Sequence, residues 1–317
     1  MTEDVLDNAF EAQKNFSNKF FDASELSESE KEEKTKEFAL ALHSEVSSLI
    51  QGINFKGHTQ KHDVSKSKIV YEGIDVFRYL LAIMNLWEVS PDEFMSHFWS
   101  KDNFLKMRHD HDQNVWSGQP VVIVDIDDVI AEFRKSFVSW LSEIGVNVDE
   151  QSPEYFFTEA FKHLGISSST VFDEFISKRR LLDLKKNVKM INTVNELYRT
   201  GFWVHLLTAR PEENMTCRYD TYSWLKQSGV KFHKVSFSPE KFLWLSKTEY
   251  QTSGKVVCAI DDSEKHALEY AKHHIKVFCP TKSYNQGCVG VENITFYDDC
   301  DVLLGQIESL YKSLDKS

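Results

Sequence analysis

The sequence predicts an α/β protein built on a doubly wound parallel sheet with a helical cap, preceded by an all-α region. Up to about residue 115, apolar residues recur only at spacings of three and four; beyond it, short apolar runs alternate with amphipathic stretches. Alternating strands and helices are typical of a parallel sheet covered on both faces. We therefore expect two domains, an all-α domain at 1–115 and an α/β domain at 116–317.

The N-terminal region contains two helical patterns. Their apolar positions are Phe38, Leu42, Val46, Leu49 and Ile53 in the first, and Val70, Ile74, Phe77, Leu81 and Met84 in the second. The second helix, at 66–88, is apolar on most sides, which predicts that it is buried. The sequence SPDEF at 90–94 predicts a helix start, with Ser90 as N-cap and Pro91 in the first position. The polar stretch 23–37 is interpreted as a solvated helix entry.

The C-terminal region is predicted strand by strand. Strands are expected at 121–125, 203–208, 256–260, 275–278 and 294–297, and helices near 129–144, 187–200, 213–228, 263–273 and 301–314. Residues 109–120 are interpreted as a linker between the domains. The insert at about 133–186 has no strong strand run and is rich in Phe, which predicts a helical cap over the edge of the sheet.

Composition limits the classes of partner. The formal net charge of -12 makes the chain a poor general binder of duplex DNA or of membrane surfaces. Local Lys, Arg and Mg²⁺ can still hold an anionic nucleotide. The five Cys include no C-x-x-C pair, which favours reduced thiols over a disulfide framework. Without a signal-peptide pattern or a membrane span, we expect a cytoplasmic protein, including in the cytoplasm of a phage-infected host.

Acidic residues follow the first predicted strand. Residues 121–125 read VVIVD, and a continuous β-branched run suits a strand buried on both faces. Asp125 is then expected at the carboxyl end of the strand, where open α/β sheets bind ligands. Asp127 follows two positions later. Two acids at that point repel each other unless a cation or a reacting phosphate lies between them.

Further polar residues end or follow the later strands, namely Thr208, Lys241 and the pair Asp261 and Asp262. Such groups suit phosphate-ester hydrolysis. A carboxylate attacks phosphorus, and a second acid protonates the leaving oxygen and later activates water. A hydroxyl and an ammonium stabilise the charge on the transferred group. Further carboxylates bind Mg²⁺, which offsets repulsion between nucleophile and substrate.

This ordered set resembles the haloacid dehalogenase (HAD) phosphatase superfamily, which has a Rossmann-like core. The segments 208–230, 239–245 and 259–267 are particularly similar to the phosphatase half of phage polynucleotide kinase. The helical cap is similar to that of the 5'(3')-deoxyribonucleotidases. The resemblance, over about 118–285, implies that Asp125 is the nucleophile and a metal ligand. It implies that Asp127 is the acid/base, with its backbone carbonyl on the metal.

The same resemblance assigns the remaining residues. It implies that Thr208 binds the phosphoryl group, that Lys241 stabilises it, and that Arg210 binds the substrate phosphate. Asp261 and Asp262 would complete the Mg²⁺ site.

Some positions depart from the family or have a simpler interpretation. Residues 128 and 129 are Asp and Val, where many members have Gly-Thr or Gly-Val, so the geometry of this loop is open. Lys247 is the alternative to Lys241, one to two helical turns later. The acids at 125, 127, 261 and 262 could also cap helices. His205, inside a predicted strand, is interpreted as a hydrogen-bonded core residue and not as a ligand.

Three acids of the N-terminal region are expected to converge. Glu72 and Asp75 lie at i and i+3 on one face of the apolar helix, and Glu45 lies on the preceding helix. Buried acids are unfavourable unless they are paired or bind metal. Carboxylates from two helices could therefore coordinate Mg²⁺, which prefers oxygen ligands.

These residues resemble the all-α nucleoside triphosphate pyrophosphatases of the MazG and dimeric dUTPase type, over about 35–110. The resemblance implies that Lys56, in the linking segment NFKGH, contacts phosphate, and that Lys101, Asn103 and Arg108 also bind substrate. Ser48 stands where the family has a Glu, so the domain is expected to bind nucleotides with or without hydrolysing them. Family members of this type usually assemble, which implies a homo-oligomer formed through the helical domain.

Together, the two halves suggest sequential reactions on a nucleotide. The first would cut a (deoxy)nucleoside triphosphate to the monophosphate and pyrophosphate, and the second would remove the remaining phosphate with Mg²⁺. A phage remodelling the nucleotide pool of its host could use such a fusion. One alternative is a polynucleotide 3'-phosphatase with a helical adaptor, which the acidic charge disfavours. Another is a nucleotide-sensing regulatory protein. Base and sugar preference cannot be predicted from these motifs.

Overall fold

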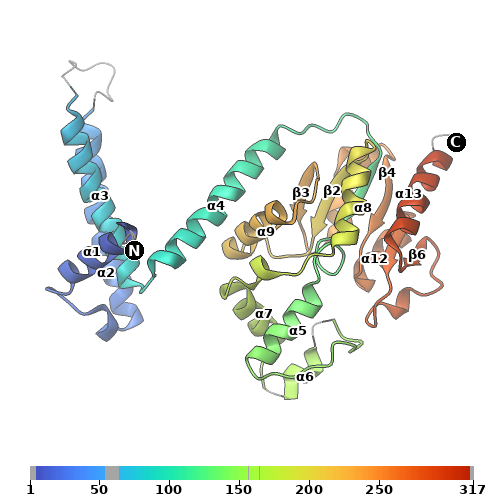
Figure 1. The fold of residues 1–317 in the computed structure, drawn as a ribbon, viewed down its shortest axis with the longest axis horizontal. Coiled ribbons are helices and arrows are strands. Elements are labelled where there is room, and N and C mark those ends of the chain that lie inside the picture. The colour runs from blue at the N-terminus through green and yellow to red at the C-terminus, as the bar shows by residue number, and fades with distance from the viewer. Residues whose placement is uncertain (1–4, 54–63, 156, 164, 315–317) are drawn as a thin grey trace. The chain divides into compact units, whose positions relative to one another are not determined.

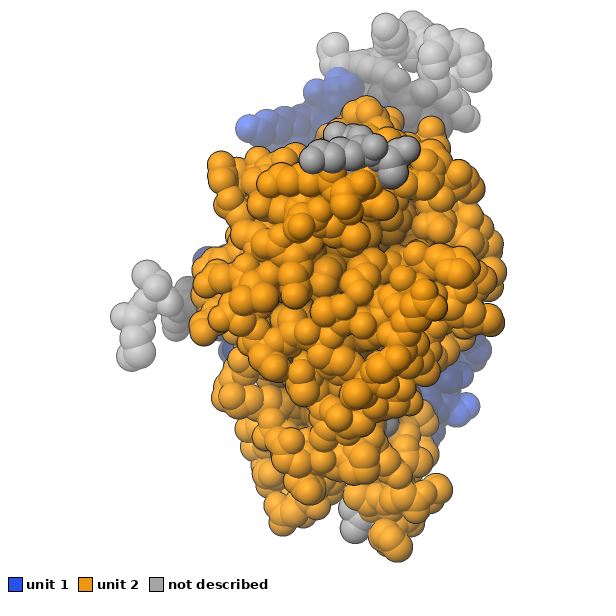
Figure 2. Space-filling model, turned by 90° about the vertical axis from the view of Figure 1, so that its right-hand side faces the viewer, with its two compact units in different colours: residues 1–99 blue, residues 100–317 orange. Residues whose placement is uncertain are grey.

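The computed structural model describes residues 5–53, 64–155, 157–163 and 165–314 (Figure 1). The chain divides into two compact units, residues 1–99 and 100–317 (Figure 2). This division falls inside one long helix, α4 (Pro91–Asp112), whereas the sequence places the domain boundary after residue 115. None of the described helices is long and apolar enough to cross a membrane.

The first unit is helical. It contains α1 (Val5–Ser17), η1 (Ala23–Glu25), α2 (Glu28–Gln51), α3 (Lys66–Leu86) and the first part of α4. A capping box starts α2, in which the Ser27 side chain accepts from the Glu30 N–H and the Glu30 carboxylate accepts from the Ser27 N–H. The predicted cap of α4 is confirmed, because the Glu93 N–H donates to Ser90 Oγ at 3.1 Å.

The prediction that the helix at 66–88 is buried is wrong. Only Leu81, Ala82 and Leu86 of α3 are buried. Val70 and Ile74, closer to its start, are 49% and 45% exposed. The linker prediction is wrong at 109–112, because α4 continues through these residues to Asp112. The polar sequence of this last turn is typical of an exposed helix surface as well as of a linker.

The second unit contains a parallel sheet of six strands, in the order β3-β2-β1-β4-β5-β6. The strands are β1 (Val121–Val124), β2 (Trp203–Thr208), β3 (Lys234–Phe237), β4 (Val256–Ile260), β5 (Val277–Pro280) and β6 (Ile294–Tyr297). The predicted doubly wound parallel sheet is thus confirmed. β3 was not predicted, and β5 begins two residues later than expected.

Helices cover both faces of this sheet. The described helices of the second unit after α4 are α5 (Phe133–Glu143), α6 (Thr158–His163), α7 (Ser168–Ser177), η2 (Arg180–Asp183), α8 (Val188–Arg199), α9 (Met215–Ser228), α10 (Lys241–Leu245), α11 (Glu249–Thr252), α12 (Glu264–Lys272), η3 (Gln286–Cys288) and α13 (Cys300–Leu314). The segment predicted to form a helical cap, 133–186, contains α5, α6, α7 and η2 (Figure 1).

Alternate residues of β1 belong to two separate cores. Val122 and Val124 pack with apolar residues of the cap and of α8, α9 and α13. Val121 and Ile123 pack with α10, α11 and α12 on the opposite face. Because successive side chains of a strand point to opposite faces, a strand buried on both must be apolar throughout, as VVIV is. This burial fixes the position of β1 in the sheet, and with it the position of Asp125, the next residue.

Candidate active site

The candidate site lies at the carboxyl ends of the two central strands. Asp125 follows β1 and Asp261 follows β4, and these strands are neighbours in the sheet. The Asp125 N–H donates to the Ile260 carbonyl at 2.9 Å, which extends the pairing by one residue. Connections leave β1 and β4 toward opposite edges, and open α/β sheets bind ligands at such a point.

Three carboxylates converge there, and one lysine binds two of them. Asp125, Asp261 and Asp262 each have an oxygen within 4.8 Å of the others, and all three residues are buried. Lys241, at the start of α10, places Nζ 2.8 Å from Asp125 Oδ2 and 2.7 Å from Asp261 Oδ2. Its side chain is 0% exposed, whereas Lys247 is an exposed residue. The geometry therefore brings Lys241, and not the alternative Lys247, to the acids.

The charges of this cluster do not balance. Three buried carboxylates face one ammonium group, so the ionised cluster has an excess of negative charge. Burial raises the pKa of Asp125 to about 6. Burial also raises the pKa values of Asp261 and Asp262, and the negative charge of Asp125 raises the pKa of Asp262 further. Burial lowers the pKa of Lys241, but Asp125 and Asp261 raise it more, so the net shift is upward. An all-oxygen cluster with unbalanced negative charge fits a hard divalent cation.

We expect Mg²⁺ binding to displace protons from this cluster. Because the pKa values of Asp125 and Asp262 are raised, these acids hold protons closer to neutral pH, and the cation must replace them. Proton release should accompany cation binding at pH 7, and affinity should fall as the pH drops toward 5.5. Titration calorimetry in two non-phosphate buffers of different ionisation enthalpy measures both the proton release and the Mg²⁺ affinity. Release that is unchanged in Asp262→Asn would contradict the assignment.

Asp127 is held by an arginine. Arg210 Nε donates to Asp127 Oδ2 at 2.9 Å, and its Nη2 donates to Oδ1 at 2.6 Å. A third guanidinium nitrogen donates to Thr221 Oγ1 at 2.9 Å. Arg210 is buried, and the Asp127 side chain is 16% exposed. Arg210, predicted to bind substrate phosphate, thus orients the predicted acid/base in this structure.

Thr208, the last residue of β2, is fully buried. Its Oγ1 accepts the N–H of Arg210 at 3.2 Å. Because β2 pairs in parallel with β1, Thr208 lies at the same edge of the sheet as the acids.

The loop after Asp127 explains the departure from the family sequence. Asp128 has φ +53°, a left-handed conformation that favours glycine. Asp is among the few other residues that adopt it readily, because its short polar side chain bonds locally. Both oxygens of Asp128 accept the N–H of Arg134, at 3.1 and 3.2 Å. Asp128 therefore adopts a backbone conformation that glycine also adopts readily.

A cavity of about 400 Å³ opens beside these groups. Its polar lining includes Asp125, Asp127, Arg210, Lys241 and Asp262. Its aromatic lining comes from the cap segment, namely Phe133, Tyr155 and Phe172, and Lys265 and His266 complete the wall. The cavity therefore combines an acidic centre with aromatic side chains from the cap.

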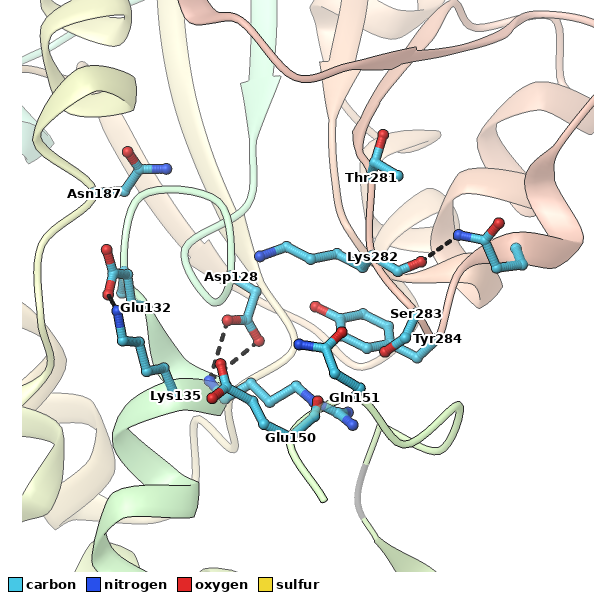
Figure 3. A pocket seen from close by; sticks show the side chains of 13 residues that line it. Asp128, Glu132, Lys135, Glu150, Gln151, Asn187, Thr281, Lys282, Ser283 and Tyr284 are labelled. Atoms are coloured by element: carbon cyan, nitrogen blue, oxygen red, sulfur yellow. Dashed lines mark hydrogen bonds and ion pairs between the residues drawn. The ribbon is translucent and has the colours of Figure 1, made fainter. Parts of the chain in front are cut away.

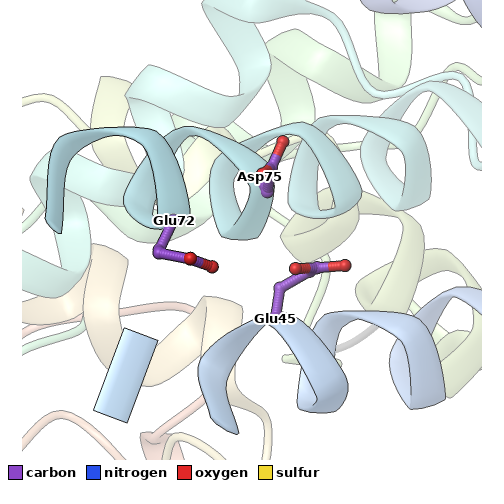
Figure 4. A group of neighbouring side chains, drawn as sticks. All are labelled: Glu45, Glu72 and Asp75. Atoms are coloured by element: carbon purple, nitrogen blue, oxygen red, sulfur yellow. The ribbon is translucent and has the colours of Figure 1, made fainter. Parts of the chain in front are cut away.

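In the first unit, Glu45, Glu72 and Asp75 converge as predicted (Figure 4), with oxygens within 4.8 Å of one another. Glu45 and Glu72 are half-buried and Asp75 is exposed, so the predicted penalty for burying them is small. Glu45 and Asp75 also line a cavity of about 550 Å³, together with Phe16, Phe20, Phe21, Phe38, Tyr79, Lys34 and Arg78.

The other predicted nucleotide contacts lie outside the described residues or in the second unit. Lys56 and its segment 54–58 lie outside the described residues. Lys101, Asn103 and Arg108 lie in the part of α4 that belongs to the second unit. There Asn103 Nδ2 donates to Ser223 Oγ at 3.3 Å, and the Arg108 guanidinium lies 5.3 Å from the Phe104 ring centre. Their role toward a nucleotide stays a prediction.

His205 is a core residue, as the sequence indicates. It is 0% exposed, its Nε2 lies 3.0 Å from Ser236 Oγ, and its Nδ1 bonds the Tyr250 hydroxyl. Burial lowers its pKa to about 3. Two further residues near the acids were not predicted from the sequence. Tyr284 and Asn285 both hydrogen-bond Asp262, from a loop with no recognisable motif.

No protein-family model matches the chain, and no curated protein matches it. Similar solved structures include a predicted phosphoglycolate phosphatase from Haemophilus somnus (13% identity, TM-score 0.44, covering 61% of this chain and 100% of that one). A HAD family hydrolase from Deinococcus radiodurans, with bound phosphate and sodium, is 12% identical (TM-score 0.43, 62% and 97% covered). D,D-heptose 1,7-bisphosphate phosphatase from B. bronchiseptica, complexed with magnesium and phosphate, is 11% identical (TM-score 0.37, 60% and 99% covered).

Proposed function

We propose that the second unit is a Mg²⁺-dependent phosphatase of the HAD superfamily that hydrolyses nucleotides through an aspartyl-phosphate. The observation that carries the proposal is the buried cluster of Asp125, Asp261 and Asp262 around Lys241 at the central strand ends. A cluster of this charge is unfavourable for stability alone, and perturbed acids in a cavity are typical of functional sites.

Each residue then has a chemical role. An oxygen of Asp125 attacks phosphorus while the bond to the leaving oxygen breaks, and protonated Asp127 donates its proton to that oxygen. Water then attacks the aspartyl-phosphate, Asp127 takes a proton from it, and Asp125 and inorganic phosphate are released. Lys241 and Thr208 stabilise charge on the transferred phosphoryl group. Arg210 keeps Asp127 in position through its two hydrogen bonds.

The metal would be held by Asp125, Asp262 and the backbone carbonyl of Asp127, with Asp261 completing the acidic set. Mg²⁺ supplies positive charge next to the transferred group and offsets repulsion between the nucleophile and its anionic substrate. Both oxygens of Asp261 have partners, since Oδ2 accepts from Lys241 and Oδ1 accepts the Ser263 N–H. Asp261 therefore also fixes Lys241.

The aromatic part of the cavity supports a nucleotide as substrate. Phe133, Tyr155 and Phe172 provide flat apolar surfaces near the acids, and such surfaces bind a base or sugar well. A polynucleotide 3'-end is the second candidate. The net charge of -12 counts against it, because tracking a strand requires a basic groove.

Substrate profiling tests the activity. The purified chain is mixed with Mg²⁺ and a panel of (deoxy)nucleoside mono- and triphosphates and 3'-phosphorylated oligonucleotides, and phosphate and pyrophosphate are quantified. We expect orthophosphate from monophosphates, at a higher rate than from oligonucleotides. Preferential hydrolysis of the oligonucleotide ends would favour the polynucleotide phosphatase, and absence of phosphate release from every substrate would rule out the proposal.

For the first unit we propose nucleotide binding at Glu45, Glu72 and Asp75, with pyrophosphate release as the associated activity. The adjoining cavity supports this, because it combines two of the acids with aromatic rings and with Lys34 and Arg78. Pyrophosphate formation that is lost in Glu72→Gln and kept in Asp125→Asn would assign the reaction to this unit. Tight nucleotide binding without turnover would instead favour the nucleotide-sensing regulatory protein. We also propose that the exposed apolar residues of α3 support assembly with a second copy.

A further inference from the structure

One loop connects the candidate metal site to the cap segment 150–155. The loop is formed by residues 281–285, after β5. On one side, the Tyr284 hydroxyl donates to Asp262 Oδ2 at 2.7 Å, and Asn285 Nδ2 donates to the Asp262 carbonyl at 3.0 Å. Tyr284 and Asn285 are both buried, as is Asp262. Side chain and backbone of Asp262 are therefore both held by this loop.

On its other side, the loop contacts the cap segment. Ser283 Oγ donates to the Ser152 carbonyl at 3.0 Å. The Tyr284 ring lies edge to face with Tyr155, with ring centres 5.0 Å apart. Tyr155 lines the catalytic cavity, so one tyrosine contacts both the cavity wall and a candidate metal ligand.

Arg134 contacts both the cap segment and Tyr284. Its guanidinium donates to the carbonyls of Glu150, Ser152, Glu154 and Tyr155, at 2.9, 2.7, 2.9 and 3.1 Å. It lies between two rings, 4.3 Å from the Phe157 centre and 4.7 Å from the Tyr284 centre. A buried cation with four carbonyl acceptors fixes the backbone of this segment.

The contact region between the loop 281–285 and the cap segment 150–155 is polar and contains a cavity of about 570 Å³ (Figure 3). Glu150 and Gln151 line it from the cap, and Lys282, Ser283 and Tyr284 line it from the loop. Beside this cavity, the Tyr284 ring contacts both Tyr155 and the Arg134 guanidinium, so a shift of the cap segment reaches Tyr284 directly. The hydrogen bond from the Tyr284 hydroxyl would transmit such a shift to Asp262.

We propose that Tyr284 is a positioning residue that orients Asp262 toward the divalent cation and couples cation binding to the order of the cap segment 150–155. This inference rests on the metal site of the proposed function. Outer hydrogen-bond partners of a ligating carboxylate set its orientation, and their loss typically weakens metal binding 10–100-fold. Coupling is reciprocal, so a cation that orders Asp262 also orders the cap segment.

The test compares Tyr284→Phe with Tyr270→Phe, in the full-length chain. The Tyr270 hydroxyl is buried and has no hydrogen-bond partner among the described residues, so its removal is a matched control. Mg²⁺ affinity is measured by titration calorimetry, and backbone amide exchange of 150–155 is measured with and without Mg²⁺. We expect Tyr284→Phe to bind Mg²⁺ about 10-fold more weakly or worse.

Amide exchange separates positioning from a general loss of structure. In the wild type and Tyr270→Phe, Mg²⁺ should slow exchange in 150–155. In Tyr284→Phe at saturating Mg²⁺, exchange in this segment should stay fast while that of β1 and β4 matches the wild type. Unchanged Mg²⁺ affinity with normal cap protection in Tyr284→Phe would overturn this inference alone. No Mg²⁺ binding by the wild type would overturn the proposed metal site as well.

Discussion

Asp125→Asn should lower the phosphatase rate by a factor on the order of 10⁴ or more, the loss typical of removing a nucleophile. An amide nitrogen or oxygen cannot replace the carboxylate in attacking phosphorus. The fold should persist, because Asn is isosteric and the substitution removes one of three clustered buried acids. Phosphate release under saturating substrate and Mg²⁺ gives the rate, and circular dichroism checks the fold.

Asp128→Asn is the matched control for this variant. It makes the same chemical change three residues later, at a position where Asn also tolerates φ +53°. Asp128 is absent from the lining of the catalytic cavity. Its variant should retain activity within about tenfold. A large loss in Asp128→Asn together with a small loss in Asp125→Asn would mean that the nucleophile is wrongly assigned.

Lys241→Met should be the most destabilising single substitution in the site. It removes the ammonium and leaves Asp125 and Asp261 without their shared partner in a buried site. Breaking a buried ion pair by removing one partner costs about 3–5 kcal/mol. We expect a loss of that size in the free energy of unfolding at pH 7 without Mg²⁺, measured by urea denaturation. Lys247→Met, at an exposed position, should change it by no more than about 0.5 kcal/mol.

The pH dependence of this loss has a defined sign. Without Lys241, the pKa values of Asp125 and Asp261 rise further, since the lysine lowers both in the wild type. Acids with raised pKa values destabilise the fold less as the pH falls, because they take up protons. The difference between Lys241→Met and wild type should therefore shrink from pH 7 to pH 5. A difference that grows instead would contradict the ion-pair geometry.

The sequence was sufficient for the features that depend on local patterns. Apolar runs identified β1, β2, β4 and β6. The runs are clearest in β1 and β4, which lie inside the sheet and are covered on both faces. Parallel pairing then brings the ends of these strands to one edge. For this reason the convergence of Asp125, Thr208 and the 261–262 pair was predictable without coordinates.

Features that depend on tertiary contacts were not predictable in this way. β3 reads KVSF, and Lys234 and Ser236 alternate with its two apolar residues, so it lacks the apolar run by which the other strands were recognised. The burial of α3 was inferred from its composition, yet composition does not specify a partner, and Val70 and Ile74 remain exposed. Tyr284 contacts Asp262 across 22 residues of sequence, through a loop whose residues carry no motif.

A crystal structure with Mg²⁺ and beryllium fluoride would show whether Asp125 accepts a phosphoryl group. Beryllium fluoride mimics a phosphoryl group on a carboxylate. We expect beryllium within bonding distance of a carboxylate oxygen of Asp125, fluorides near Lys241, and Mg²⁺ on the Asp262 side chain. Beryllium fluoride bound to another residue under saturating conditions, or Asp125 turned away from it, would mean that Asp125 is not the nucleophile.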